Sequence, residues 1–201
     1  MAFAFSHPHP ALADAIRRAR GQRNVLFFAA ASNNKYFSED PVGFPAKMDE
    51  VIRVNSCSHS GKRSSFSPRG SERRGDNLGT IGEEMPAADA GAGTGGRGRG
   101  ERRMSGTSMA TAVMTGVAAL VVEFSRLAPA PEIYPDRPRE QVTTELLTND
   151  GMKAVLHRCL AGVNPPAPPT YCYIRPWLLF DVNNQDVMAS RIRDALTVLG
   201  V

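Results

Sequence analysis

The sequence predicts an α/β fold in three layers around a mostly parallel sheet, and three segments carry that prediction. Residues 24–31 (NVLFFAAA) form an unbroken apolar run of strand length, which is typical of a parallel strand covered on both faces. Residues 10–20 (PALADAIRRAR) repeat apolar side chains at helical spacing just before it. Residues 105–126 form a long apolar helix later in the chain. Helices that alternate with buried strands favour a sheet with helices on both faces.

The remaining elements follow from shorter patterns. Gly21 is expected to end the first helix, because glycine is common just past a helix C-terminus. Further along we expect a strand at Glu50–Asn55, mostly loop at Cys57–Gly82, a proline-rich surface crossing at Leu127–Arg139, and helices at Thr148–Leu160 and Val187–Leu199.

Two segments stand out by composition. Ala87–Arg103 is rich in glycine and almost without large apolar residues, so we expect it to be poorly ordered and dispensable for the core. No GxGxxG follows a strand there, which argues against a phosphate-binding loop. Thr107–Phe124, in contrast, is apolar nearly all round, and this predicts a helix buried at the centre of a domain.

Composition excludes several classes of protein. The chain has 201 residues, 42% hydrophobic and 22% charged, so it can form a core. It contains no unbroken apolar run of the ~18–20 residues that a bilayer span needs and no basic segment before its short apolar start. The three cysteines show no metal-type spacing and cannot all pair. We therefore expect a cytoplasmic protein without a membrane partner.

The net charge of +4 comes mainly from arginine, with 20 Arg against 4 Lys. The most basic stretch, GGRGRGERR, lacks the interleaved aromatic residues that stack on bases, so we expect no nucleic-acid partner. The acidic residues do not cluster at metal-ligand spacing, and we expect neither a metal nor a cofactor. The oligomeric state stays open.

Two residues could carry chemistry. Ser108 lies in the first turn of the predicted apolar helix, where free amides and the helix dipole favour an anion forming at the serine. Asn33 follows the carboxyl end of the buried strand, where open α/β sheets place ligands, and its amide could donate to an oxyanion. Each residue also has a purely structural alternative: Ser108 could cap the helix, and Asn33 could be a turn residue.

Together the two segments resemble a known family. NVLFFAAASNN resembles the V-A-A-A-G-N strand of the subtilases, the subtilisin-like serine proteases (peptidase family S8). FPAKMDEVIRVNS, RSSFSPRGS and SGTSMATAVMTGVAALV resemble the next three blocks of that family, in the same order and with the same spacing. The later segments MKAVLHRCL and YCYIRPW resemble intracellular fungal members.

The resemblance implies a serine endopeptidase, a hydrolase that cleaves polypeptides through an acyl-enzyme. It makes Ser108 the nucleophile and Asn33 the side-chain donor of the oxyanion hole, with the backbone N–H of Ser108 as second donor. Ala30, Ala31 and Ser32 would line the pocket for the substrate side chain that precedes the scissile bond.

The sequence departs from the family pattern in two residues and two motifs. Ser32 stands where the family has glycine, and Ala112 where it has proline. The D-x-G and H-G-T motifs, which carry the Asp and His of the catalytic triad, do not occur. None of the four histidines has the family context; they are His7, His9, His59 and His157.

MAFAF resembles a strand of the substrate groove, so the sequence is expected to begin inside the catalytic domain, as an N-terminally truncated subtilisin-like fold. Residues 1–126 would be the C-terminal half of that domain, and residues 127–201 proline-rich linkers with a helical extension. Two functions stay open: a serine endopeptidase by descent that is inactive as this chain, or a pseudo-protease that acts as a binding module without catalysis.

Overall fold

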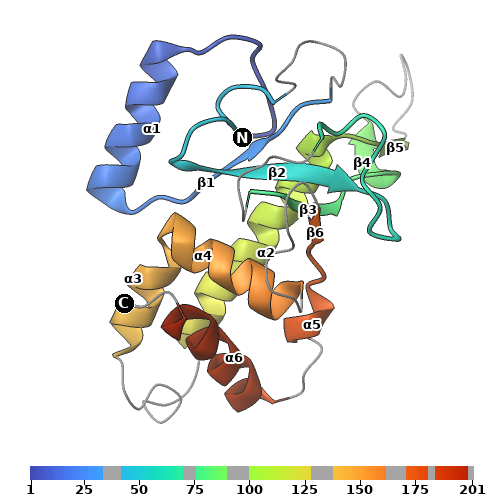
Figure 1. Cartoon of the computed structure of the whole chain (residues 1–201). Coiled ribbons are helices and arrows are strands. Elements are labelled where there is room, and N and C mark those ends of the chain that lie inside the picture. Colours follow the sequence, from blue (N-terminus) through green and yellow to red (C-terminus); the bar gives the residue numbers. More distant parts are fainter. Residues whose placement is uncertain are drawn as a thin grey trace.

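The computed structural model describes residues 1–33, 42–69, 76–89, 100–127, 138–161, 171–180 and 184–198. A four-stranded sheet lies at the centre in the order β1-β2-β3-β6, and all three neighbouring pairs are parallel. One helix covers one face and a group of helices covers the other (Figure 1). The predicted α/β fold with a mostly parallel sheet is confirmed. The strands are β1 (Phe27–Ala30), β2 (Val51–Cys57), β3 (Leu78–Ile81) and β6 (Cys172–Tyr173).

The two predicted strands form as adjacent strands of this sheet. The register pairs Phe27 with Val51 and Ala30 with Val54. Both strands are buried over most of their length, which explains their unbroken apolar sequence. The described residues between Cys57 and Gly82 are mostly loop, as predicted, with the addition of strand β3. Its sequence LGTI is too short to show a periodicity.

Helix α1 (Pro10–Arg23) covers one face of the sheet. Its residue Ile16 packs in a cluster with Ala29 of β1 and Val51 of β2. The helix runs through Gly21, so the predicted stop there is wrong. Asn24 ends it instead with a left-handed φ of 49°, and its N–H bonds the carbonyl of Arg20.

Helix α2 (Thr107–Leu127) lies across the other face of the sheet. Met114 and Val121 on its inner side are fully buried, and the predicted helix is confirmed. Its outer side is exposed, with Leu120 58% accessible, so the prediction that the helix is covered all round is wrong for this chain. Helix α2 is long and apolar enough to cross a membrane, but the core helix of a soluble protein can have the same length and composition.

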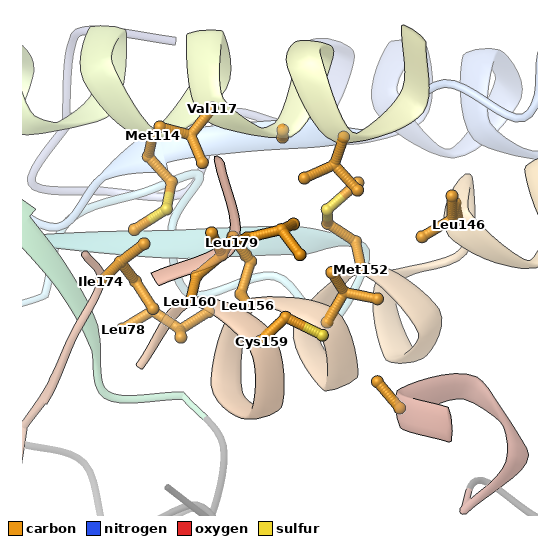
Figure 2. Packing of buried hydrophobic residues seen from close by; sticks show 14 of the residues in the cluster. Leu78, Met114, Val117, Leu146, Met152, Leu156, Cys159, Leu160, Ile174 and Leu179 are labelled. Carbon is orange, nitrogen blue, oxygen red and sulfur yellow. The ribbon is translucent and has the colours of Figure 1, made fainter. Parts of the chain in front are cut away.

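The C-terminal helices pack against α2 and share one core with the sheet (Figure 2). Leu146, Leu156 and Leu160 from this region have no exposed surface, and they lie in the same cluster as Leu78 of β3. The predicted helices at 148–160 and 187–199 are confirmed with shifted ends. The elements are α3 (Arg139–Leu146), α4 (Asn149–Val155), the π-helical turn η2 (Leu156–Leu160), α5 (Trp177–Phe180) and α6 (Gln185–Thr197).

The ends of the glycine-rich segment are ordered. Strand β4 (Met85–Asp89) pairs antiparallel with β5 (Gly100–Met104). The prediction of poor order from Ala87 to Arg103 is therefore wrong at both ends, and its centre, residues 90–99, lies outside the described residues. Most of the predicted proline-rich crossing, residues 128–137, also lies outside them.

Candidate active site

The candidate site forms where the carboxyl end of the sheet meets the start of α2. Backbone hydrogen bonds connect the two: Gly82, after β3, donates its N–H to Cys57 of β2, and Gly106 donates to Gly82. A Cβ on Gly82 would lie 2.5 Å from Ser56 Oγ and 2.8 Å from the Gly106 carbonyl oxygen. Glycine at this position thus allows the chain to enter α2 directly against the strand ends.

Asn33, which follows β1, contacts the first residue of α2. Its Oδ1 accepts hydrogen bonds from Thr107 N–H at 2.8 Å and from Thr107 Oγ1 at 2.9 Å. Because both donors act on the oxygen, the amide NH2 is directed elsewhere. A Cβ on Gly106 would lie 3.0 Å from Nδ2, so glycine is needed beside the amide. The arrangement leaves Asn33 Nδ2 as a fixed donor at the helix start.

Ser108 is the second residue of the same helix. Its backbone N–H has no recorded acceptor among the described residues, whereas Met109 and Ala110 donate theirs to the Gly106 carbonyl. The Ser108 hydroxyl donates to the carbonyl oxygen of Ala2 at 2.8 Å. The structure therefore brings Asn33 and Ser108 together through Thr107, as the sequence motifs suggest.

The three residues predicted to line a substrate pocket lie beside Asn33 in sequence. Ala30 is 2% exposed and Ala31 is fully buried, so only their backbone could face a ligand. Ser32 is half-buried and has a φ of 153°, a conformation that favours glycine. The pocket assignment for Ala30, Ala31 and Ser32 stays a prediction.

No histidine of the chain hydrogen-bonds Ser108 among the described residues. His9 accepts from Leu12 N–H at the start of α1, and His7 pairs with Ser6. His157 is buried, with Nδ1 3.1 Å from Cys172 Sγ. His59 lines a cavity of about 450 Å³ together with Tyr173. Within the described residues, the Ser108 hydroxyl thus bonds a backbone carbonyl and not a histidine.

The three cysteines are free and buried within the described structure. Burial raises the pKa of Cys57 and Cys159 to about 12 and that of Cys172 to about 11. At neutral pH all three are protonated thiols, which are poor nucleophiles. Thiol chemistry therefore does not compete with Ser108 for a catalytic assignment.

Sequence reasoning missed two partners of the site. Thr107 lies inside the G-T-S-M-A motif, so the sequence shows that it is next to Ser108. Its two hydrogen bonds to Asn33 join residues 74 positions apart, which no local pattern indicates. The bond from Ser108 to the Ala2 carbonyl spans 106 residues, and alanine carries no side-chain signal for it.

Comparisons with known proteins agree on one family. The sequence model of the Subtilase family (Peptidase S8) matches residues 4–158. The "Subtilisin-like protease het-Q2" of Podospora anserina is 31% identical over 134 residues, which are 66% of this chain and 35% of that protein. Among solved structures, a mutant of the protease domain of PatA matches with a TM-score of 0.58 and 23% sequence identity. The PatG macrocyclase in complex with peptide matches with a TM-score of 0.59 and 20% sequence identity.

The PatA match covers 98% of this chain and 56% of the PatA chain, and the PatG match covers 96% and 50%. The chain thus spans about a third of its curated relative and about half of these two solved chains. The likeness to the solved structures supports the fold, and the family match covers well over half of this chain. The chain belongs to the subtilase family of serine peptidases.

Proposed function

We propose that this chain carries the nucleophile and the oxyanion hole of a serine endopeptidase that acts on polypeptides. The observation that carries the proposal is the pairing of Asn33 Oδ1 with Thr107, which directs Asn33 Nδ2 away from Thr107 at the start of the helix. Among the described residues, the Ser108 N–H at the same helix start has no backbone acceptor. Two fixed donors next to one hydroxyl are what the tetrahedral intermediate of acyl transfer requires.

In the proposed reaction, Ser108 Oγ bonds to the carbonyl carbon of the scissile peptide. The negative charge on the carbonyl oxygen is stabilised by Asn33 Nδ2 and by Ser108 N–H. The amide C–N bond then breaks, the leaving amine takes the proton that a general base removed from Oγ, and water hydrolyses the acyl-enzyme. The start of α2 adds its dipole to the stabilisation of the anion.

We infer that the described residues lack a general base for Ser108, because within them no hydrogen bond joins a histidine to its hydroxyl. The Ser108 hydroxyl donates to the Ala2 carbonyl, which cannot take its proton. In a complete triad, loss of a member leaves only ~10³–10⁴-fold acceleration over water. The 201-residue chain by itself is therefore proposed to be nearly inactive.

Fluorophosphonate labelling of Ser108 tests the proposal. The 201-residue chain should not label stoichiometrically, whereas a chain extended upstream by a segment with D-x-G and H-G-T motifs should label. Ser108→Ala in the extended chain should remove the label. An extended, folded chain that stays unlabelled would contradict the protease function.

The second candidate function is a binding module without catalysis. The hydrogen bond from Ser108 to the Ala2 carbonyl favours it, because the hydroxyl proton is directed to a group that cannot act as a base. Rapid fluorophosphonate labelling of the 201-residue chain would contradict both candidate functions, since neither expects this chain to be active by itself. His59 would then be the first residue to mutate.

A further inference from the structure

A cavity of about 450 Å³ lies beside β6, the edge strand of the four-stranded sheet. Residues of β6, of the loop that follows β2 and of the segment that leads from β6 into α5 line this β6 cavity, and Figure 1 shows these last two elements one after the other. Its volume is in the range that encloses a small ligand. Neither Asn33 nor Ser108 lines it, so it is separate from the candidate active site.

The walls of the β6 cavity are largely aromatic. Tyr171, Tyr173 and Trp177 all line it. Trp177 is 52% exposed, although its indole ring is among the largest apolar groups of any side chain. Aromatic rings pack favourably on other rings in offset or edge-to-face arrangements. Three of them around one hollow therefore favour a ligand that itself contains a flat ring.

The fold holds the two tyrosine rings in place. The Tyr171 hydroxyl donates to the carbonyl oxygen of Pro68. The ring of Tyr173 lies against the backbone of Gly61, where an added Cβ would be 2.9 Å from Tyr173 Cδ1. Glycine also suits the left-handed φ of 79° at this position. Because these walls form without a ligand, binding does not have to order them first, and this lowers the cost of binding.

The β6 cavity also contains a positive charge. Arg175 lines it, and its guanidinium donates one hydrogen bond, to the Ala161 carbonyl at 2.6 Å. The backbone N–H of Arg175 donates to the Leu160 carbonyl at 2.7 Å, which fixes the base of the side chain. Among the described residues that line the cavity, no side chain is acidic. A guanidinium in this setting favours a carboxylate, which it can bind through two parallel N–H donors.

A second cavity, of about 560 Å³, shows no such preference for an anion. Lys153 Nζ lies 2.8 Å from Asp76 Oδ1 in its wall. Its charged lining residues are Lys47, Arg53, Lys153, Asp49, Asp76 and Asp150. The two signs compensate one another there, whereas the charge of Arg175 is left for a ligand.

We propose that the β6 cavity is a binding site for a small aromatic carboxylate. The carboxylate accepts hydrogen bonds from Arg175, and the ring packs against Tyr171, Tyr173 and Trp177. These four residues all follow residue 158, where the match to the family model ends. The proposal concerns a site apart from Ser108 and does not depend on the proposed peptidase function.

The test uses the single tryptophan of the chain as its probe. Because Trp177 lines the β6 cavity, its one indole N–H signal in a ¹H–¹⁵N correlation spectrum reports on binding there. Benzoate should shift this signal in a saturable way, with a Kd on the order of 1 mM for a ligand of this size. Benzamide has the ring without the charge, and cyclohexanecarboxylate has the charge without the aromatic ring. Each should bind about fivefold weaker or less well still.

Two variants of the cavity should weaken the binding of benzoate. Arg175→Gln removes the cation and should raise the Kd by about tenfold or more. Ser60→Glu adds a negative charge at an exposed position of the lining and should raise the Kd by about fivefold. The matched controls are Arg18→Gln and Ser6→Glu, which make the same replacements at exposed positions outside the lining. Both controls should keep the original Kd.

Each outcome decides the proposal. Weaker binding in the two cavity variants, with the controls unchanged, supports it, provided that circular dichroism shows the variants folded. Ser60→Glu decides by itself if Arg175→Gln does not fold, because Ser60 is on the surface. The proposal is wrong if benzoate causes no saturable shift, or if the cavity variants and the controls bind it equally. Equal binding of benzamide would remove the role of the charge, and equal binding of cyclohexanecarboxylate that of the aromatic ring, and either result overturns the assigned ligand class.

Discussion

The side-chain oxygen of Asn33 accepts two hydrogen bonds from Thr107, one from the backbone N–H at 2.8 Å and one from the hydroxyl at 2.9 Å. The first residue of α2 thereby sets the orientation of an amide that comes from the end of β1. A rotated amide would place its NH2 against the Thr107 N–H, which can only donate, so the bonded orientation is favoured. The oxyanion donor of the proposed site is thus held by the residue that precedes the nucleophile.

Removing the Thr107 hydroxyl should therefore slow acylation. In the upstream-extended chain, we expect Thr107→Val to lower the rate of fluorophosphonate labelling by about tenfold, while Asn33→Ala lowers it by about 10²–10³-fold. Thr107→Ser keeps the hydroxyl and should retain most of the rate. If Thr107→Val and Thr107→Ser lose rate equally, the hydroxyl does not orient Asn33.

The glycine after β3 should be essential for stability. A methyl group on Gly82 would meet Ser56 Oγ and the Gly106 carbonyl, so we expect Gly82→Ala to lower the free energy of unfolding by about 1–3 kcal/mol in urea titrations. Gly21→Ala is the matched control, because nothing lies within 4 Å of its Cβ and Gly21 is inside α1. The control should be stabilised by about 0.5–1 kcal/mol.

The sequence predicted those parts of the fold that depend on contiguous patterns. The buried strand β1, the helix α2 and the sequence neighbourhood of Ser108 are all visible in contiguous runs of the sequence. Strand β3 was not, because it is only four residues long and its Leu78 is buried by residues of helices that come much later in the chain. Helix α1 ends at Asn24 because this one residue adopts a left-handed backbone conformation. The sequence pointed to Gly21 instead, since glycine is the more common residue at a helix end. Helix α2 was predicted correctly as a helix but not in its surroundings. Its apolar sequence indicates that both faces are covered, and the described residues cover only one of them.

Alkaline pH should destabilise the protein through its buried thiols. Burial raises the pKa of Cys57 and Cys159 to about 12 and of Cys172 to about 11, above the ~8.5 of an exposed thiol. Between about pH 9 and 11 the unfolded chain loses these protons while the native chain keeps them. The native state then binds more protons, so the free energy of unfolding falls as pH rises, by up to about 1.4 kcal/mol per thiol and pH unit.

Urea titrations at pH 8 and pH 10.5 measure this loss. Cys159→Ala should be less stable at pH 8, because it leaves a small cavity, yet lose less stability between the two pH values. The raised pKa of Tyr171, which follows mainly from its burial, acts in the same direction. An equal loss in Cys159→Ala and in the unmodified chain would show that this thiol is not the titrating group.

Residues 90–99 should be replaceable by a tight turn. The antiparallel register pairs Asp89 of β4 with Gly100 of β5, so the two ends of this segment already lie opposite each other. A two-residue Asn-Gly connection closes such a pair with a type I′ turn. Because β4 and β5 form a separate two-stranded sheet, the shortened hairpin leaves the four-stranded sheet and its core untouched. We expect the melting temperature of the shortened chain to stay within about 2 °C of the original, since loop-closure entropy changes only slowly with the length of a connection. A loss of 8 °C or more, which is on the order of 2–4 kcal/mol for a domain of this size, would show that residues 90–99 contribute to the packed structure.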